Sequence, residues 1–303
     1  MRISEFRNGK AEARYRTAYE GALDRLWPGE RTSLDIPTGY GTTRVHRAGP
    51  AHGTPIVLLP GSGGNALMWH SYIEPLAARH PVIAVDTVGE PGASVQSAPV
   101  ADGRDAADWL EELLAALGLP AVHLVGCSYG GWIALHHRIR HPGRATGLTL
   151  VDSAGLADLS PRFYRWIILG GLAALAPRAL RPRLARKLGN SAILDTELMA
   201  LLRASAGFRR RLPLAATLTD DELRAVGAPV LALLGGRSAL HDAPTTAERL
   251  HRLLPDAEVH TVPDAGHSLT TDDPGAVLTG ILTMAARQAG RTDGLNGPVE
   301  RTG

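Results

Sequence analysis

The feature that most constrains this chain is a series of short apolar runs that alternate with helical segments. Polar residues seldom interrupt these runs, and each run spans only four or five positions. Strands of this composition are typical of a parallel sheet covered by helices on both faces, because neither face of the strand meets water. The runs are Pro55–Leu59, Pro81–Val85, Val122–Val125, Gly147–Val151, Val230–Leu234 and Val259–Val262. The sequence therefore predicts an α/β fold with a mostly parallel, doubly wound sheet.

One interval breaks this alternation. Counting two short strands near residues 33–46, the sixth and seventh strands are separated by 78 residues of helical composition. That length far exceeds an ordinary crossover connection, so we expect a helical cap inserted after the sixth strand. The expected parts are an N-terminal helical extension (1–29), a core (30–153 and 226–289), the cap (154–225) and a polar, glycine-rich disordered tail (290–303).

Composition narrows the class of protein. The 303 residues are 44% hydrophobic, which is enough for a large core, and the net charge of +2 gives no reason to expect a nucleic acid or a membrane as partner. The single cysteine, Cys127, fits a reducing compartment, and the first residues lack an apolar leader. We therefore expect a soluble cytoplasmic protein. No His, Cys and Asp residues have metal-ligand spacing, so neither a metal nor an organic cofactor is expected.

A glycine-flanked serine follows the third apolar run. Gly126-Cys127-Ser128-Tyr129-Gly130-Gly131 lies between that run and a helical segment. This is the G-x-S-x-G pattern in the context that gives it a mechanism, because a sharp strand-to-helix turn lifts the hydroxyl clear of the sheet. A turn that merely connects two elements is the alternative. The context favours Ser128 as a nucleophile.

The chain resembles the α/β-hydrolase superfamily over about residues 30–288. It is most similar to the capped branch, which includes esterases, carbon–carbon bond hydrolases and haloperoxidase-like enzymes. This resemblance implies a general base after the last strand, where Ala265-Gly266-His267 stands. It also implies an oxyanion hole formed by two main-chain N–H groups, those of Ser62 and Tyr129. The loop before Ser62 departs from the family pattern, because Pro60 replaces the usual histidine.

The carboxylate that should orient His267 is missing from its usual place. In the family it follows the glycine at the end of the penultimate strand, and Ser238 occupies that position here. Asp152, at the end of the sixth strand, is one substitute, because some relatives keep their acid there. Asp242 is the alternative, although it precedes Ala243-Pro244 and has the context of a helix N-cap. A site without an acid is the third possibility.

The expected cap is basic and contains an apolar stripe. Residues 155–213 contain ten arginines, Lys187 and three carboxylates, which gives this segment a net charge of +8. This charge could attract an anionic or carrier-linked substrate, or it could lie on a solvated outer face. The apolar residues at positions 166–169, 172 and 175 could roof a substrate pocket or pack as an ordinary helix against the core. The first interpretation predicts a small, partly hydrophobic substrate.

Together these features predict a serine hydrolase of the esterase kind. Ser128 would attack an ester, thioester or activated carbonyl, and His267 would move the proton. Two alternatives stay open: an acyltransferase or cyclase on the same fold, and a non-hydrolytic lyase-like or binding relative whose triad is incomplete.

Overall fold

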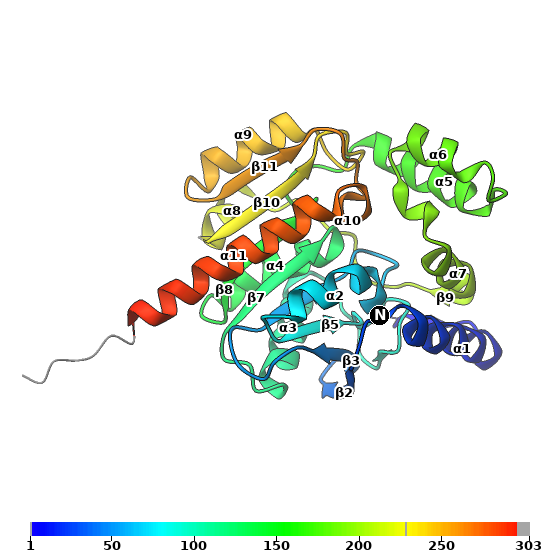
Figure 1. Cartoon of the computed structure of the whole chain (residues 1–303), viewed down its shortest axis with the longest axis horizontal. Helices are drawn as coiled ribbons and strands as arrows, with labels where there is room; N and C mark the ends of the chain where they lie inside the picture. Colours follow the sequence, from blue (N-terminus) through cyan, green and yellow to red (C-terminus); the bar gives the residue numbers. More distant parts are fainter. Residues whose placement is uncertain (1, 228, 296–303) are drawn as a thin grey trace, which may run out of the picture.

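A nine-stranded sheet lies at the centre of the chain in this computed structural model, which describes residues 2–227 and 229–295 (Figure 1). The strand order is β11-β10-β8-β7-β4-β5-β3-β2, and β6 pairs with β3. The strands are β2 (Thr32–Thr38), β3 (Gly41–Ala48), β4 (Ile56–Leu59), β5 (Val82–Val85), β6 (Val95–Gln96), β7 (Val122–Cys127), β8 (Ala145–Val151), β10 (Val230–Gly235) and β11 (Glu258–Val262). All neighbours from β11 to β5 pair in parallel, whereas β2, β3 and β6 pair antiparallel. The predicted fold class is confirmed.

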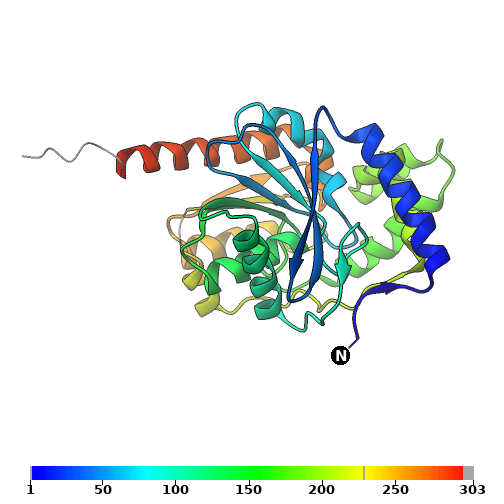
Figure 2. The same cartoon turned by 90° about the horizontal axis from the view of Figure 1, so that it is seen from below.

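The apolar runs are buried on both faces of this sheet, as their composition predicts. Along β4, Val57 and Leu59 join one hydrophobic cluster, and Ile56 and Leu58 join the other. The first cluster contains side chains of α3 (Gly103–Ala116), α4 (Tyr129–Arg140), α8 (Asp220–Val226) and α9 (Ala243–Leu253). The second contains side chains of α1 (Gly9–Leu26), η1 (Ala66–Trp69), α2 (His70–Ala77), α10 (Leu269–Asp272) and α11 (Pro274–Leu295). Figure 2 shows helices on both sides of the sheet.

The long interval between β8 and β10 holds a group of helices before the chain returns to the core at α8. Its elements are α5 (Pro161–Leu175), α6 (Arg181–Leu188), η2 (Ser191–Leu194), α7 (Thr196–Ala204), η3 (Ser205–Gly207) and β9 (Phe208–Arg209). These helices share a small hydrophobic cluster of their own, which includes Ala173, Ala185 and Met199. Figure 1 shows α5 and α6 side by side at one extremity of the molecule.

The N-terminal segment is attached to this helical group. Strand β1 (Glu5–Phe6) pairs antiparallel with β9, and Arg25 of α1 forms a 2.6 Å ion pair with Glu197 of α7.

At the other end of the chain, α11 continues to Leu295, which is six residues into the expected disordered tail. This corrects the predicted boundary, because glycines at 290 and 294 lower helix propensity by only about 1 kcal/mol each and no proline stops the helix. Residues 296–303 of that tail lie outside the described residues. No helix in the described part of the chain is long and apolar enough to cross a bilayer.

Candidate active site

A sharp turn between β7 and α4 holds Ser128. Its backbone has φ 49° and ψ −112°, a conformation that costs a non-glycine residue about 1–3 kcal/mol. The turn also requires the flanking glycines. A Cβ on Gly126 would lie 2.5 Å from the Gly130 carbonyl carbon, and a Cβ on Gly130 would lie 2.3 Å from the Leu59 carbonyl oxygen. The turn therefore places Ser128 at the carboxyl end of β7 and at the start of a helix.

Asp152 follows directly on β8, the strand beside β7. Its φ is 42°, and among the non-glycine residues that the structure describes only Asp152 and Ser128 have a positive φ. Its side chain is fully buried and accepts hydrogen bonds from the end of β10 and from the loop that follows it. The Gly235 N–H donates to Oδ1 at 2.9 Å, and the Ser238 hydroxyl donates to Oδ2 at 2.6 Å. The carboxylate is therefore fixed by the end of β10, although its own residue belongs to β8.

His267 lies in the loop after β11 and contacts this carboxylate. Its Nδ1 lies 2.6 Å from Asp152 Oδ2. A ring nitrogen against a carboxylate oxygen carries the proton, so Nε2 is left as the acceptor that a general base needs. Two aromatic rings of α5 meet the imidazole edge to face, Phe163 at 5.1 Å and Trp166 at 5.3 Å between ring centres.

The surroundings keep Asp152 ionised. Burial alone would raise the pKa of its carboxyl group, because a low dielectric disfavours charge. The hydrogen bond and charge of His267, the charge of His241 and the Ser238 hydroxyl act in the opposite direction, and the pKa of Asp152 lies below its ordinary value. The carboxylate can therefore stabilise a protonated imidazole.

Ser128, Asp152 and His267 all lie at the carboxyl edge of the sheet. The Ala154 N–H donates to the Ser128 carbonyl at 3.1 Å, which connects the turn at Ser128 to the segment that carries Asp152. Ser128 and His267 are each 9% exposed. No hydrogen bond joins their side chains in the described residues, so the structure connects His267 to Asp152 but not yet to Ser128. Contacts between a nucleophile and its base often tighten only when substrate binds.

The other candidate acid lies elsewhere. Asp242 is the N-cap of α9, where its Oδ1 accepts hydrogen bonds from the N–H and the hydroxyl of Thr245 at 3.1 and 2.7 Å. Helix capping, the alternative that its Ala-Pro context suggested, therefore accounts for its position. Its neighbour His241 is a site residue that the sequence analysis missed. This buried imidazole has Nε2 3.5 Å from Asp152 Oδ1, and burial lowers its pKa.

The two N–H groups expected at the oxyanion hole lie beside Ser128. Tyr129 is the first residue of α4, where N–H groups have no acceptor within the helix. Ser62 follows Gly61, and a Cβ on that glycine would lie 3.4 Å from Ser128 Cβ. Neither N–H has an acceptor among the described residues.

An ion pair between the buried carboxylate of Glu90 and the partly exposed Arg210 contacts this loop. The Gly63 N–H donates to Glu90 Oε2 at 3.0 Å, and Arg210 Nε donates to Glu90 Oε1 at 2.8 Å. The Arg210 guanidinium also lies 4.6 Å from the centre of the Tyr129 ring. Burial raises the pKa of Glu90 in spite of this partner. Glu90 and Arg210 are 120 positions apart, so no local sequence pattern could have paired them.

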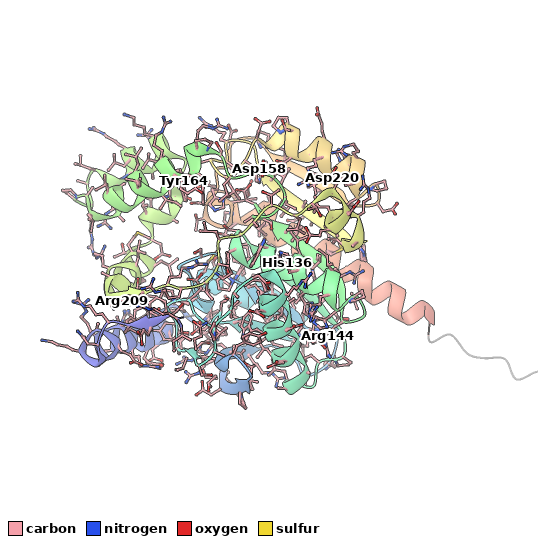
Figure 3. All side chains as sticks on the ribbon, turned by 180° about the vertical axis from the view of Figure 1, so that it is seen from behind. His136, Arg144, Asp158, Tyr164, Arg209 and Asp220 are labelled. Atoms are coloured by element: carbon pink, nitrogen blue, oxygen red, sulfur yellow. The ribbon has the colours of Figure 1, made fainter. Side chains whose placement is uncertain are left out.

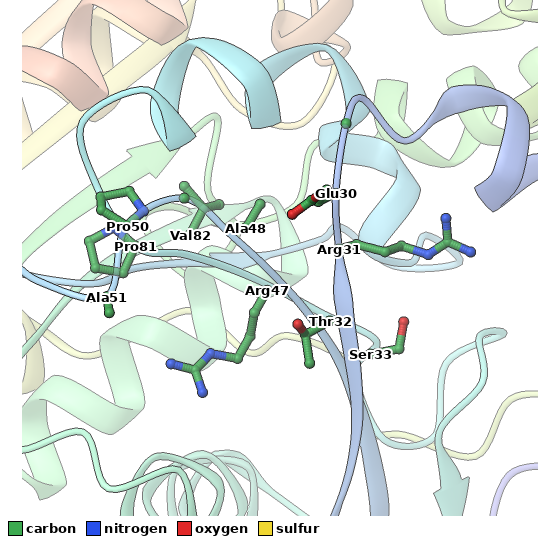
Figure 4. Close-up of a pocket in the computed structure, with 12 residues that line it drawn as sticks. Glu30, Arg31, Thr32, Ser33, Arg47, Ala48, Pro50, Ala51, Pro81 and Val82 are labelled. Atoms are coloured by element: carbon green, nitrogen blue, oxygen red, sulfur yellow. The ribbon is translucent and has the colours of Figure 1, made fainter.

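A cavity of about 790 Å³ lies at the opposite edge of the sheet, lined among others by Arg31, Arg47 and Pro81 (Figure 4). Strand β5 begins at Val82, so this cavity borders the amino ends of the parallel strands, whereas Ser128 and Asp152 follow carboxyl ends. It is separate from the candidate site. Neither there nor elsewhere in residues 2–227 and 229–295 do three or more His, Cys, Asp or Glu side chains form a group that could hold a metal ion.

Comparison with known proteins settles the family. The chain matches the profile of the alpha/beta hydrolase family over residues 56–279. It belongs to the alpha/beta hydrolase family. Carboxylesterase YbfK of Bacillus subtilis is 27% identical to this hydrolase, in an alignment that covers 89% of this chain and 93% of YbfK. The carboxylesterase nap of the same species is also 27% identical, and that alignment covers 91% of this chain and 94% of nap. The crystal structure of the Bacillus subtilis naproxen esterase superposes with a TM-score of 0.78 at 26% identity, covering 91% of this chain and 98% of that one.

These relatives make the hydrolase an enzyme of the esterase type. The superfamily predicted from the Ser128 turn and the Ala265-Gly266-His267 loop is thereby confirmed. The roles of individual residues rest on the geometry given above.

Proposed function

We propose that this hydrolase cleaves an ester, thioester or activated carbonyl substrate through an acyl-enzyme on Ser128. The observation that carries the proposal is the 2.6 Å contact between His267 Nδ1 and the buried, ionised Asp152. That contact orients the imidazole at the edge of the sheet where the strained turn presents Ser128.

The reaction follows from these positions. Ser128 Oγ attacks the carbonyl carbon while its proton passes to His267 Nε2, and the negative charge that forms on the carbonyl oxygen is bound by the N–H groups of Ser62 and Tyr129. Collapse of the tetrahedral intermediate breaks the bond to the leaving group, which takes the proton from His267. Water then attacks the acyl-enzyme and gives a proton to His267 Nε2; the bond between the acyl carbon and Ser128 Oγ breaks, Oγ takes the proton back, and the acid product leaves. Asp152 stabilises the imidazolium in both halves of the cycle.

Two aromatic side chains indicate a partly hydrophobic substrate. Phe163 and Trp166 are half-buried and lie against His267, so the group nearest the reacting carbonyl meets apolar surface. This supports a small-molecule substrate with an apolar acyl or alcohol portion.

A fluorophosphonate probe tests the proposed nucleophile. The folded protein is expected to form a covalent adduct on Ser128 and to hydrolyse p-nitrophenyl esters, and Ser128→Ala is expected to lose both properties. The matched control is Ser97→Ala, because Ser97 is exposed. Mass spectrometry of the adduct identifies the site. Labelling or full turnover that survives in Ser128→Ala, or a folded wild-type protein that does not label, would overturn the proposal.

A further inference from the structure

Helix α5 presents an apolar stripe to solvent. Tyr164, Ile168, Leu172 and Leu175 are 51%, 63%, 61% and 70% exposed. Their spacing of four, four and three residues places them on one face of the helix, which we call the α5 stripe. Of the apolar residues expected to roof a pocket or pack on the core, Trp166 does contact His267, whereas those at 167–169, 172 and 175 are exposed.

The stripe faces away from the rest of the protein. Phe163 and Trp166, which meet His267, and Ala173 and Ala174, which enter the small cluster of the cap, all lie on the opposite side of α5 by helical periodicity. Figure 3 shows α5, with Tyr164 labelled, at the outer part of the molecule from behind. Contiguous exposed apolar surface of this kind is rare on a monomer without a binding role.

The segment that carries the stripe contains charge of one sign. Residues 161–188, which contain α5 and α6, include seven basic residues and no acidic one. Six of the seven are exposed: Arg162, Arg165, Arg178, Arg183, Arg186 and Lys187. The net charge of +2 for the whole chain hides this concentration, and the expectation that no membrane is involved rested on that whole-chain value.

We propose that the α5–α6 segment binds an anionic lipid surface. A helix that combines exposed apolar side chains with cations lies in the plane of the interface, its apolar face among the first acyl carbons and its cations at the phosphates. The 15 residues of α5 extend roughly 22 Å, too short to cross a bilayer, so the helix lies along the surface. A second copy of this chain fits less well, because six exposed basic residues on each partner would repel each other.

Such binding would also place the candidate active site at the lipid surface. The side of α5 opposite the stripe contacts His267, so one helix connects the surface to the general base. This consequence rests on the proposed function, whereas the binding itself does not.

Vesicle co-sedimentation tests the binding without catalysis. All proteins carry Ser128→Ala, so that failure of the esterase proposal cannot change the result. Vesicles of phosphatidylcholine are compared with vesicles that also contain phosphatidylglycerol. We expect at least tenfold stronger partitioning to the anionic vesicles, and weaker partitioning at high salt because the Debye length shortens.

Two variants separate the contributions. Ile168→Ser/Leu172→Ser and Arg183→Gln/Arg186→Gln/Lys187→Gln are each expected to reduce partitioning at least tenfold. The matched controls are Leu202→Ser on α7, 45% exposed, and Arg224→Gln on α8, also exposed, and both should bind as the parent does. Because the altered side chains are exposed, the melting temperatures should stay unchanged, which keeps a loss of binding interpretable.

The proposal is overturned if the parent protein does not bind anionic vesicles, or if the stripe variant binds them equally well. It is also overturned if the stripe instead supports a dimer that Ile168→Ser/Leu172→Ser dissociates, or a complex with an acidic carrier protein in the absence of vesicle binding.

Discussion

The strands of the sheet and helix α5 are similarly rich in apolar residues, yet they end in opposite environments. Leu124 of β7 is completely buried, whereas Leu172 of α5 is 61% exposed. A central strand has a layer of helices above it and another below it, so every side chain finds a partner. Helix α5 packs on one side only and has no second layer beyond it. An apolar run thus predicts burial only when the fold supplies neighbours on each side that the run presents.

Substitution at these two leucines gives the largest stability difference that the comparison predicts. Leu124→Ala should lower the free energy of unfolding by about 2–5 kcal/mol, because it removes buried methyl groups and leaves a cavity. Leu172→Ala should change it by less than about 0.5 kcal/mol. Chemical denaturation of both variants measures the difference. An equal loss of unfolding free energy in both variants would mean that Leu172 is covered in solution, so the two regions would not differ in burial.

Part of the fold could be predicted because its signals are local. The unbroken apolar runs indicate strands buried on both faces, and the glycines around Ser128 are those that a tight turn requires. The solvent-facing side of α5 was not predictable, because residues at spacings of three and four show that a face is apolar but not what covers it. The continuation of α11 through 290–295 was also missed, since polar and glycine-rich composition describes weak helices as well as tails.

The site divides in the same way. Ser128 and His267 stand in recognisable local motifs, and the structure places both at the carboxyl edge of the sheet. The sequence shows Ser238 only as the residue that replaces the usual acid. Its hydrogen bond to Asp152 could not be predicted, because it forms only when strands β8 and β10 lie side by side. His241, and the pairing of Glu90 with Arg210, likewise depend on contacts between distant segments.

Removing the Ser238 hydroxyl should change the rate of catalysis, and its free-energy effect should be smaller than the stability loss expected for Leu124→Ala. Ser238→Ala takes away a donor to a charged acceptor, a hydrogen bond that contributes about 1.5–3 kcal/mol to stability, so kcat should fall, and by at most roughly 150-fold. Because this hydrogen bond lowers the pKa of Asp152, its loss should also move the acid limb of the pH–rate profile to higher pH.

The helical segment between β8 and β10 offers a matched control for this prediction. Ser160 caps α5 through the Arg162 N–H and does not contact Asp152, so Ser160→Ala should leave kcat and the pH profile unchanged. Steady-state kinetics of the two variants compare a serine beside Asp152 with a serine at the start of α5. If both variants behaved alike, Ser238 would not position the acid.

The proposed mechanism depends on which carboxylate orients His267. Asp152→Asn and Asp242→Asn are to be compared by kcat/KM on one p-nitrophenyl ester, with folding checked by circular dichroism. We predict a loss of about 10⁴-fold for Asp152→Asn, because the amide no longer holds His267 as a base. For Asp242→Asn we predict nearly full activity, since asparagine also caps helices well. Full activity in Asp152→Asn, or a comparable loss in Asp242→Asn, would contradict the account.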